Sequence, residues 1–327
     1  MAASPPVVSV VLPSYNHEHY VEAAVTSVLS QSFNDLELIA WDDGSSDGSL
    51  DRLRSLADTD PRLRVRTHDG NANHGLARTL RAAVEESTGS HLAVIASDDR
   101  WLPQRLERML ELMPGRDAVY ALAYVIDEKG DRTGATYGRA PDQPDLFEQL
   151  LLQNVIPAPC VLMTRAAYDA VGGYDLDAPY EDLHLMVRLA GGGRFGFLPE
   201  PVADYRISSS GLHQETERRA GRFAAIARTL AGIDPQSLPA EQQRRRLADL
   251  VAAWQWMTAW EEPGAAFPSS ARGASDVPRL VSAWQLLLPE TCTRDRQLAL
   301  VRALGRRDPV AAARVLATLV RRRRALS

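Results

Sequence analysis

The first hundred residues alternate between short apolar runs and segments in which apolar residues recur every three or four positions. Continuous apolar runs of this length predict strands that are buried on both faces of a parallel sheet. These runs are Val7–Pro13, Leu36–Trp41, Leu63–Thr67 and Leu92–Ala96. Apolar residues at i, i+3 and i+4 predict helices near residues 21–29, 50–56 and 76–84. The regular alternation predicts βαβ units and a doubly wound, mostly parallel sheet flanked by helices.

The pattern changes twice in the rest of the chain. A helix over Gln104–Leu112, strands over Val119–Ile126 and Cys160–Met163 and a helix that begins at Glu181 are predicted first. Residues 132–150 are polar and show no periodicity, and we interpret them as a mobile loop over an active site at the ends of the strands. From Leu212 onward the spacing is helical, in segments near 213–231, 239–260, 276–289, 293–305 and 308–325. We therefore expect an α/β domain over 1–210 and an all-α C-terminal domain over 211–327.

Bulk composition is that of an ordinary globular protein. The 327 residues are 45% hydrophobic and 24% charged. No stretch approaches the roughly 20 apolar residues of a membrane-spanning helix, and the first residues lack the regions of a signal peptide. We therefore expect a cytoplasmic protein. Two distant cysteines, Cys160 and Cys292, exclude a disulfide scaffold and a thiolate metal site.

Charge is divided unevenly between the two halves. Residues 1–210 hold 18 basic and 31 acidic side chains, whereas residues 211–327 hold 19 basic and 11 acidic ones. The acidic first part argues against nucleic acid as a partner. The chain ends in a basic run, Arg321–Arg324, which is either a solvated helix end or a contact for anionic lipid at the inner face of a membrane.

Two adjacent carboxylates, Asp98 and Asp99, follow the fourth apolar run directly. Ligands bind at the carboxyl ends of strands in open α/β sheets. Neighbouring carboxylates repel each other unless a cation or a hydrogen-bonding ligand shares their site. The alternative is that they cap a helix that opens near Pro103, and the residues alone leave both interpretations open.

Acidic residues also occupy two further places where chemistry is expected. The turn Asp42–Ser49, with the sequence DDGSSDGS, can present a carboxylate to a nucleoside ring or ribose, or can be a solvated turn in which Asp47 caps the next helix. Glu181 and Asp182 begin a helix, either as dipole-compensating residues or as a functional pair. Neither GxxxxGK[ST] nor GxGxxG follows a predicted strand, which excludes the common nucleotide-binding loops.

These motifs together resemble those of the inverting family-2 glycosyltransferases with the GT-A fold. The resemblance is carried by the segment PSYNHEHYVEAAVTSVLSQSFNDLELIAWDDGSSDGS, by Asn73-His74-Gly75, by Ala96-Ser97-Asp98-Asp99 and by Glu181-Asp182. It covers about residues 7–210 and is specific, because the motifs occur in the right order and spacing.

The resemblance implies a role for each matching residue. Pro13 and Tyr15 would line the pocket of the base, with Tyr15 stacking on it, and Asp43 would accept a hydrogen bond from the base, commonly uracil. Asn73 and Gly75 would close the nucleotide side. Asp98 and Asp99 would hold Mn²⁺ or Mg²⁺ against the diphosphate. Asp182 would be the general base, supported by Glu181.

The expected activity is transfer of a sugar, with inversion, from a nucleotide-diphosphate sugar to a hydroxyl group. We expect a UDP-sugar as donor and a glycan, lipid-linked or small-molecule acceptor, in polysaccharide or glycan biosynthesis. Arg188 and Arg206 are candidates for phosphate or base contacts. The sequence leaves the oligomeric state open, a homo-oligomer included.

Two departures from the family pattern keep other functions open. Ala96 stands where many relatives have a first acid, and Ser208 stands where relatives usually have a histidine that His213 would have to replace. A catalytically degenerate binding or scaffold protein is therefore one alternative. A sugar nucleotidyltransferase is another, although it would need a glycine-rich basic loop after the first strand, where this chain has PSYNHEHY.

Overall fold

The computed structural model describes residues 5–141, 146–152, 154–207 and 219–241, together with 243–244, 247–248 and 251. The chain divides into two compact units, which are residues 1–215 with 237–239 and residues 216–236 with 240–327. In the second unit, α9 spans Arg219–Ala231. The helices predicted near 276–289, 293–305 and 308–325 lie outside the described residues, so the all-α C-terminal domain stays a prediction.

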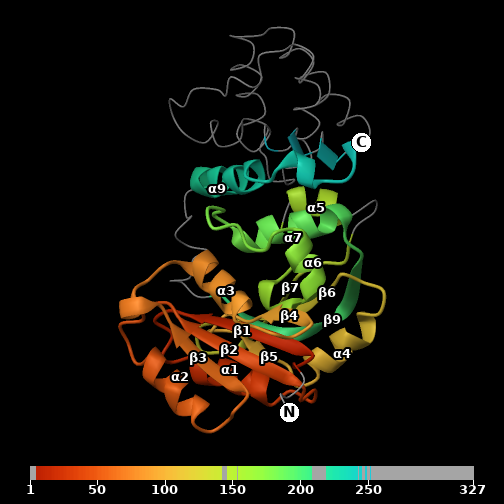
Figure 1. Ribbon diagram of the computed structural model, residues 1–327. Helices are drawn as coiled ribbons and strands as arrows, with labels where there is room; N and C mark the ends of the chain where they lie inside the picture. Colours follow the sequence, from red (N-terminus) through yellow and green to blue (C-terminus); the bar gives the residue numbers. More distant parts are fainter. Residues whose placement is uncertain are drawn as a thin grey trace. The chain divides into compact units, whose positions relative to one another are not determined.

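The first half of the sheet consists of parallel strands in the order β3-β2-β1-β4 (Figure 1). Its strands are β1 (Val8–Ser14), β2 (Leu36–Asp42), β3 (Leu63–Thr67) and β4 (His91–Val94). The connecting helices are α1 (Val21–Leu29), α2 (Ser49–Ala57) and α3 (Leu76–Glu85), with a short 3₁₀ turn, η1 (Asp69–Asn71), before α3. This half confirms the predicted βαβ alternation.

Beyond β4 the sheet is mixed. It continues in the order β4-β8-β6-β9-β5, and β7 pairs with β6. The strands are β5 (Arg100–Trp101), β6 (Ala118–Ile126), β7 (Arg132–Tyr137), β8 (Val161–Thr164) and β9 (Phe195–Arg206). β8 is antiparallel to both β4 and β6, whereas β9 is parallel to β6. The helices are α4 (Arg105–Leu112), α5 (Leu146–Leu152), α6 (Arg165–Ala170) and α7 (Glu181–Gly192), with 3₁₀ turns η2 (Ala158–Cys160) and η3 (Pro235–Ser237).

Helices cover both faces of the parallel half of the sheet. On one face, α1 buries Val21, Ala24, Val25 and Val28 in a core that also contains alternate residues of β1. On the other face, α3 contacts β1 and β2; Figure 1 shows it across the sheet from α1 and α2. The loops at the carboxyl ends of the strands are therefore the natural place for polar functional side chains.

The structure corrects the interpretation of residues 132–150 as one mobile loop. Residues 132–137 form β7, which pairs with β6, and residues 146–152 form α5; residues 142–145 lie outside the described residues. Five of the six β7 residues are exposed, so the strand has no apolar alternation to read from the sequence.

In the part of the chain that the structure describes, no helix has both the length and the apolar character that crossing a bilayer requires. The basic run Arg321–Arg324 lies outside the described residues, and its contact with lipid stays a prediction. Cys160 is a buried free thiol, and Cys292 also lies outside the described residues.

Candidate active site

The carboxyl ends of three neighbouring parallel strands meet at one edge of the sheet. Ser14, the last residue of β1, is paired in register with Asp42, the last residue of β2. On the other side of β1, Val11 is paired with Val94, the last residue of β4. The loops that carry the predicted donor-side residues therefore leave the sheet side by side.

Hydrogen bonds join these three loops directly. The backbone N–H of Asn16 donates to Ser45 Oγ at 2.9 Å, which ties the loop after β1 to the loop after β2. His17 Nδ1 lies 2.7 Å from Ser97 Oγ, which ties the same loop to the one after β4. The predicted segments thus form one connected cluster of polar loops.

Asp43 organises a turn that comes from the next strand along the sheet. The residue is only 5% exposed. Its Oδ1 accepts from the backbone N–H of His74 at 2.7 Å, and its Oδ2 accepts from the backbone N–H of Gly75 at 3.0 Å. The side-chain amide of Asn73 donates to the Asp43 carbonyl at 2.9 Å. The structure therefore brings together Asp43, Asn73 and Gly75, which the sequence analysis assigned to one nucleotide site.

Aromatic rings occur at the carboxyl ends of the same strands. Tyr15 follows β1 directly and is 49% exposed. The imidazole of His74 stacks on that of His68, with ring centroids 4.1 Å apart, and His68 in turn lies 5.2 Å from the ring of Trp41. Burial and then the neighbouring His74 lower the pKa of His68, although Asp43 opposes this shift. Pro13, which is partly buried, is paired in register with Trp41.

The contact between the turn after β2 and the turn that begins at Asn71 requires glycine at position 44. Gly44 has a φ of 77°, and a Cβ there would lie 2.7 Å from Asn73 N and 2.8 Å from backbone atoms of Ala72 and Asn71. Gly70 has a comparable φ of 67°, but a Cβ on it would meet nothing within 4 Å. Alanine at either position would be strained by the positive φ, and Gly44→Ala would in addition clash with the backbone of the neighbouring turn.

We expect Gly44→Ala to lose about 1–3 kcal/mol more free energy of unfolding than Gly70→Ala, because overpacking adds to the shared backbone strain. Urea unfolding of the two variants, followed by circular dichroism, measures this difference. Equal losses would contradict the close approach of the two turns.

Asp99 is a buried carboxylate, and one of its two oxygens accepts no hydrogen bond from the described residues. It is 1% exposed, and its Oδ1 accepts from the backbone N–H of Arg206 at 2.8 Å. Its Oδ2 is buried and has no hydrogen-bond partner among the described residues. Burial and then the adjacent Asp98 raise the pKa of Asp99 well above its usual range. Asp98 itself is partly exposed.

The alternative in which Asp98 and Asp99 cap a helix is wrong. They are followed by the short strand β5, which pairs with β9. The next helix, α4, begins only at Arg105, and its N-cap residue is Gln104.

The donor chemistry of this pair fits a hard divalent cation. The described residues contain no group of three or more His, Cys, Asp or Glu side chains that could hold a metal ion, which agrees with the missing acid at Ala96. An orphaned carboxylate oxygen beside a second carboxylate still offers the oxygen ligands that Mg²⁺ prefers, and Mg²⁺ usually takes few protein ligands and completes its shell with phosphate and water.

Glu181 and Asp182 form the first turn of α7. Asp182 Oδ1 accepts from the backbone N–H of Leu183 at 2.7 Å, and its Oδ2 accepts from the side-chain amide of Asn154 at 3.0 Å. Burial and then the charge of Asp182 raise the pKa of Glu181 to about 8. At neutral pH the pair therefore keeps a proton on Glu181.

The raised pKa of Glu181 makes stability depend on pH. The folded state holds this proton up to about pH 8, whereas the unfolded chain releases it near 4.5. Because the folded state binds more protons between these values, stability falls as pH rises through this range. In calorimetric scans, we expect the difference in Tm between Glu181→Gln and the wild type to change in favour of the variant from pH 5 to pH 8.5. Glu111→Gln, at an exposed position, is the control, and a Tm difference for Glu181→Gln that is independent of pH would contradict the assignment.

Tyr205 interacts electrostatically with Asp98, Asp99 and Asp182. It lies near the end of β9, next to Val125 of β6. Burial raises its pKa first, and Asp99, Tyr137, Asp182 and Asp98 raise it further by their electrostatic interaction with the phenol. The predicted metal motif and the predicted base therefore both lie within electrostatic reach of one side chain.

Two arginines that were candidates for phosphate or base contacts donate hydrogen bonds to backbone carbonyls instead. Arg206 is 8% exposed and donates through Nε to the Asp98 carbonyl at 2.9 Å. Arg188 donates to the carbonyls of Val171 and Gly173. Both guanidinium groups hold backbone in place around the site. Ser208 and His213 lie outside the described residues, so the replacement of the family histidine stays a prediction.

Asn154 and Tyr137 also belong to this region, although neither lies in a recognisable sequence motif. Asn154 contacts Asp182 across 28 residues of chain, and the Tyr137 hydroxyl donates to the Asn154 carbonyl at 3.0 Å. Both occur in or near the segment without periodicity, so no pattern in the sequence pointed to them.

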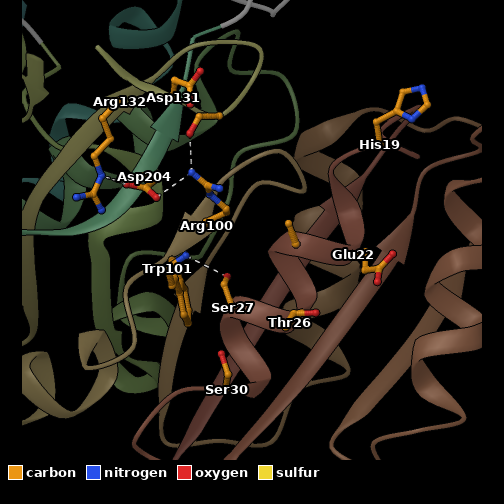
Figure 2. Close-up of a pocket in the computed structure, with 12 residues that line it drawn as sticks. His19, Glu22, Thr26, Ser27, Ser30, Arg100, Trp101, Asp131, Arg132 and Asp204 are labelled. Carbon is orange, nitrogen blue, oxygen red and sulfur yellow. Dashed lines mark hydrogen bonds and ion pairs between the residues drawn. The ribbon is translucent and has the colours of Figure 1, made fainter. Parts of the chain in front are cut away.

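A separate surface pocket with a volume of about 810 Å³ lies beside α1 and β5 (Figure 2). Arg100 and Arg132 line it, and both pair with Asp204, at 3.1 Å and 2.8 Å. None of the predicted site residues lines this pocket. Both arginines pair with the same carboxylate, that of Asp204, and we do not assign the proposed chemistry to this pocket.

Comparison with known proteins identifies the family of this chain. The family model for Glycosyl transferase family 2 matches residues 9–172, which is half of the chain. TuaG of Bacillus subtilis (strain 168), whose name describes a glycosyltransferase of teichuronic acid biosynthesis, is 39% identical over 116 residues, which cover 36% of this chain and 45% of TuaG.

Two further proteins extend the comparison. The UDP-Glc:alpha-D-GlcNAc-diphosphoundecaprenol beta-1,3-glucosyltransferase WfgD of Escherichia coli is 35% identical over 107 residues, which cover 33% of this chain and 41% of WfgD. The chain thus spans less than half the length of these two relatives. The mannosyltransferase PcManGT of Pyrobaculum calidifontis, solved with GDP-Man and Mn²⁺, superposes with a TM-score of 0.58 at 18% identity, over 97% of this chain and 87% of that one. This similarity confirms the predicted GT-A fold.

Proposed function

Because the chain belongs to glycosyl transferase family 2 and has the GT-A fold, we propose that it transfers a sugar from a nucleotide-diphosphate sugar to a hydroxyl group of an acceptor. The observation that carries the proposal is that Asp98, Asp99 and Asp182 all interact electrostatically with the phenol of Tyr205. This supports a site in which a cation-binding pair and a candidate base act on two substrates that are held near each other, as a transfer reaction requires.

The donor nucleotide is assigned to the strand ends around Asp43. Tyr15 offers an exposed ring on which a base can stack. Asp43 is held by the N–H groups of His74 and Gly75, and each carboxylate oxygen can accept a further hydrogen bond from a base. The UDP-sugar in the name of WfgD supports UDP as the nucleotide, whereas the GDP-Man of PcManGT keeps GDP as the competing choice.

Asp98 and Asp99 are the residues that would hold a divalent cation. Mn²⁺ or Mg²⁺ there would neutralise the negative charge that develops on the leaving diphosphate. The orphaned Oδ2 of Asp99 and the Mn²⁺ of PcManGT support this assignment. Arg206 supports the pair by holding the carbonyl of Asp98 and the carboxylate of Asp99.

Asp182 is proposed as the general base. As the acceptor O–H bond breaks, its proton moves to a carboxylate oxygen of Asp182. The acceptor oxygen attacks the anomeric carbon from the face opposite the diphosphate, and the bond from that carbon to the diphosphate oxygen breaks with its electron pair going to the diphosphate. This single displacement inverts the configuration at the anomeric carbon.

The test is a donor panel with the full chain. UDP-glucose, UDP-N-acetylglucosamine and GDP-mannose are each incubated with Mn²⁺, with water as the acceptor, and the released nucleoside diphosphate is measured. UDP and GDP are also tested for their effect on the Tm, with and without Mn²⁺. We expect turnover of a UDP-sugar and a rise in Tm with UDP that is larger when Mn²⁺ is present.

Two other outcomes would contradict the proposal. A rise in Tm without turnover of any donor would favour a binding or scaffold protein. Pyrophosphate release from UTP and a sugar phosphate would favour a nucleotidyltransferase.

A further inference from the structure

We propose that Asn154 is a positioning residue for Asp182, whose carboxylate it holds in the orientation and charge state that proton removal requires. This inference rests on the function proposed above, in which Asp182 is the base. Asn154 itself is given no contact with the substrate.

The orientation of the Asn154 amide is set by its own two hydrogen bonds. Its Oδ1 accepts from the backbone N–H of Ile156 at 3.2 Å, so its Nδ2 is the end that faces Asp182. Nδ2 then donates to Asp182 Oδ2 at 3.0 Å. With Leu183 N donating to Asp182 Oδ1, each carboxylate oxygen has a fixed donor, and rotation about χ2 of Asp182 would break both bonds.

The segment that carries Asn154 is itself anchored to the strands. The hydroxyl of Tyr137 donates to the Asn154 carbonyl at 3.0 Å. The ring of Tyr137 stacks on that of Tyr205, with centroids 5.4 Å apart. The backbone N–H of Arg139 also donates to the carbonyl of Val155 at 3.2 Å. Asn154 thus links the start of α7 to the ring that lies within reach of Asp98 and Asp99.

Hydrogen bonds also decide which member of the acidic pair carries the charge. Two N–H groups donate to Asp182, and donors to a carboxylate favour its ionised form. Burial favours the protonated form of the neighbouring Glu181. The Asn154 amide therefore helps to keep the proton on Glu181 and the negative charge on Asp182, which a base needs in order to act.

Removal of the amide should change the pH profile as well as the rate. With the best donor of the panel, Mn²⁺ and water as acceptor, we expect Asn154→Ala to lower kcat by up to about 100-fold, as a small misplacement of a reacting group can do. We expect the acidic limb of its kcat profile to move to higher pH by about one unit, because the ionised form of Asp182 has lost a donor. The KM for the donor should stay unchanged.

Tyr137→Phe is the matched control. It removes the bond to the Asn154 carbonyl and leaves the amide in place, so its acidic limb should stay at the wild-type pH. A merely structural role for Asn154 would lower the rate in both variants without moving either profile.

The outcomes separate this inference from the proposed function. If Asp182→Asn is inactive while Asn154→Ala has wild-type kcat and pH profile, the positioning role is overturned and the proposed base remains. An unshifted acidic limb in a slowed Asn154→Ala variant overturns it as well. If Asp182→Asn retains full activity, or no donor is turned over, the proposed function fails first.

Discussion

Replacement of Asp182 by asparagine is expected to lower kcat by about 10²- to 10⁴-fold, the usual contribution of a general base. The reason is chemical, since an amide is nearly the size of a carboxylate but cannot take the proton of the acceptor hydroxyl. Donor binding involves other residues, so the KM for the nucleotide sugar should change little. Steady-state release of nucleoside diphosphate measures both quantities.

Two further variants make this result interpretable. Asp177→Asn changes an exposed carboxylate five residues before Asp182 and should retain wild-type activity. The exchange Asn154→Asp with Asp182→Asn keeps an amide and a carboxylate in contact but moves the carboxylate away from α7. We expect this double variant to be near wild type in stability and as slow as Asp182→Asn. Recovery of activity in the exchange would contradict the assignment of the base to position 182.

The second large effect is expected at the cation-binding pair. Asp98→Asn should lower turnover at a fixed, subsaturating Mn²⁺ concentration about 100-fold and raise the Mn²⁺ concentration that gives half-maximal activity. Loss of a carboxylate ligand weakens the binding of the ion. Because the bound ion stabilises the charge on the leaving group by several kcal/mol, turnover falls when less of the enzyme holds the ion. Asp98 is the better position to change than Asp99, because Asp99 also accepts from the Arg206 backbone.

Removal of the ion tests the same point in the unaltered chain. A chelator should abolish turnover, and added Mn²⁺ or Mg²⁺ should restore it. Asp58→Asn, at an exposed carboxylate at the end of α2, should leave the Mn²⁺ dependence unchanged. Full activity of the wild type in chelator would contradict a metal-assisted reaction, and an unchanged Mn²⁺ dependence of Asp98→Asn would remove that residue from the site.

The parallel half of the sheet was predictable because the apolar pattern of its strands and helices indicates which residues are buried. The runs in β1 and β2 are apolar nearly throughout, and α1 spaces its buried valines at helical intervals. The antiparallel half was harder to predict. β7 is exposed along almost its full length, and β9 contains Pro199 and Pro201, near which its register with β6 shifts.

The site residues also divide into those that the sequence could predict and those that it could not. Asp43, Asp98 and Asp182 could be named because each belongs to a motif at the start or end of a regular element. Asn154 could not, because its significance arises only when α7 returns to it in the folded chain. Arg188 and Arg206 show the opposite error, since charge and position suggested ligands, whereas the folded chain uses both to bind its own carbonyls.

The placement of β8 between β4 and β6 has a practical consequence for dissecting this protein. β8 covers the edge of β4, whose Leu92 and Ala93 are buried, and it arrives about 70 residues later in the chain. A fragment that stops after α4 would contain all four parallel strands yet leave that edge open, and unpaired apolar edges recruit other chains. Such a fragment should self-associate, so truncation for structural work has to retain residues through β8.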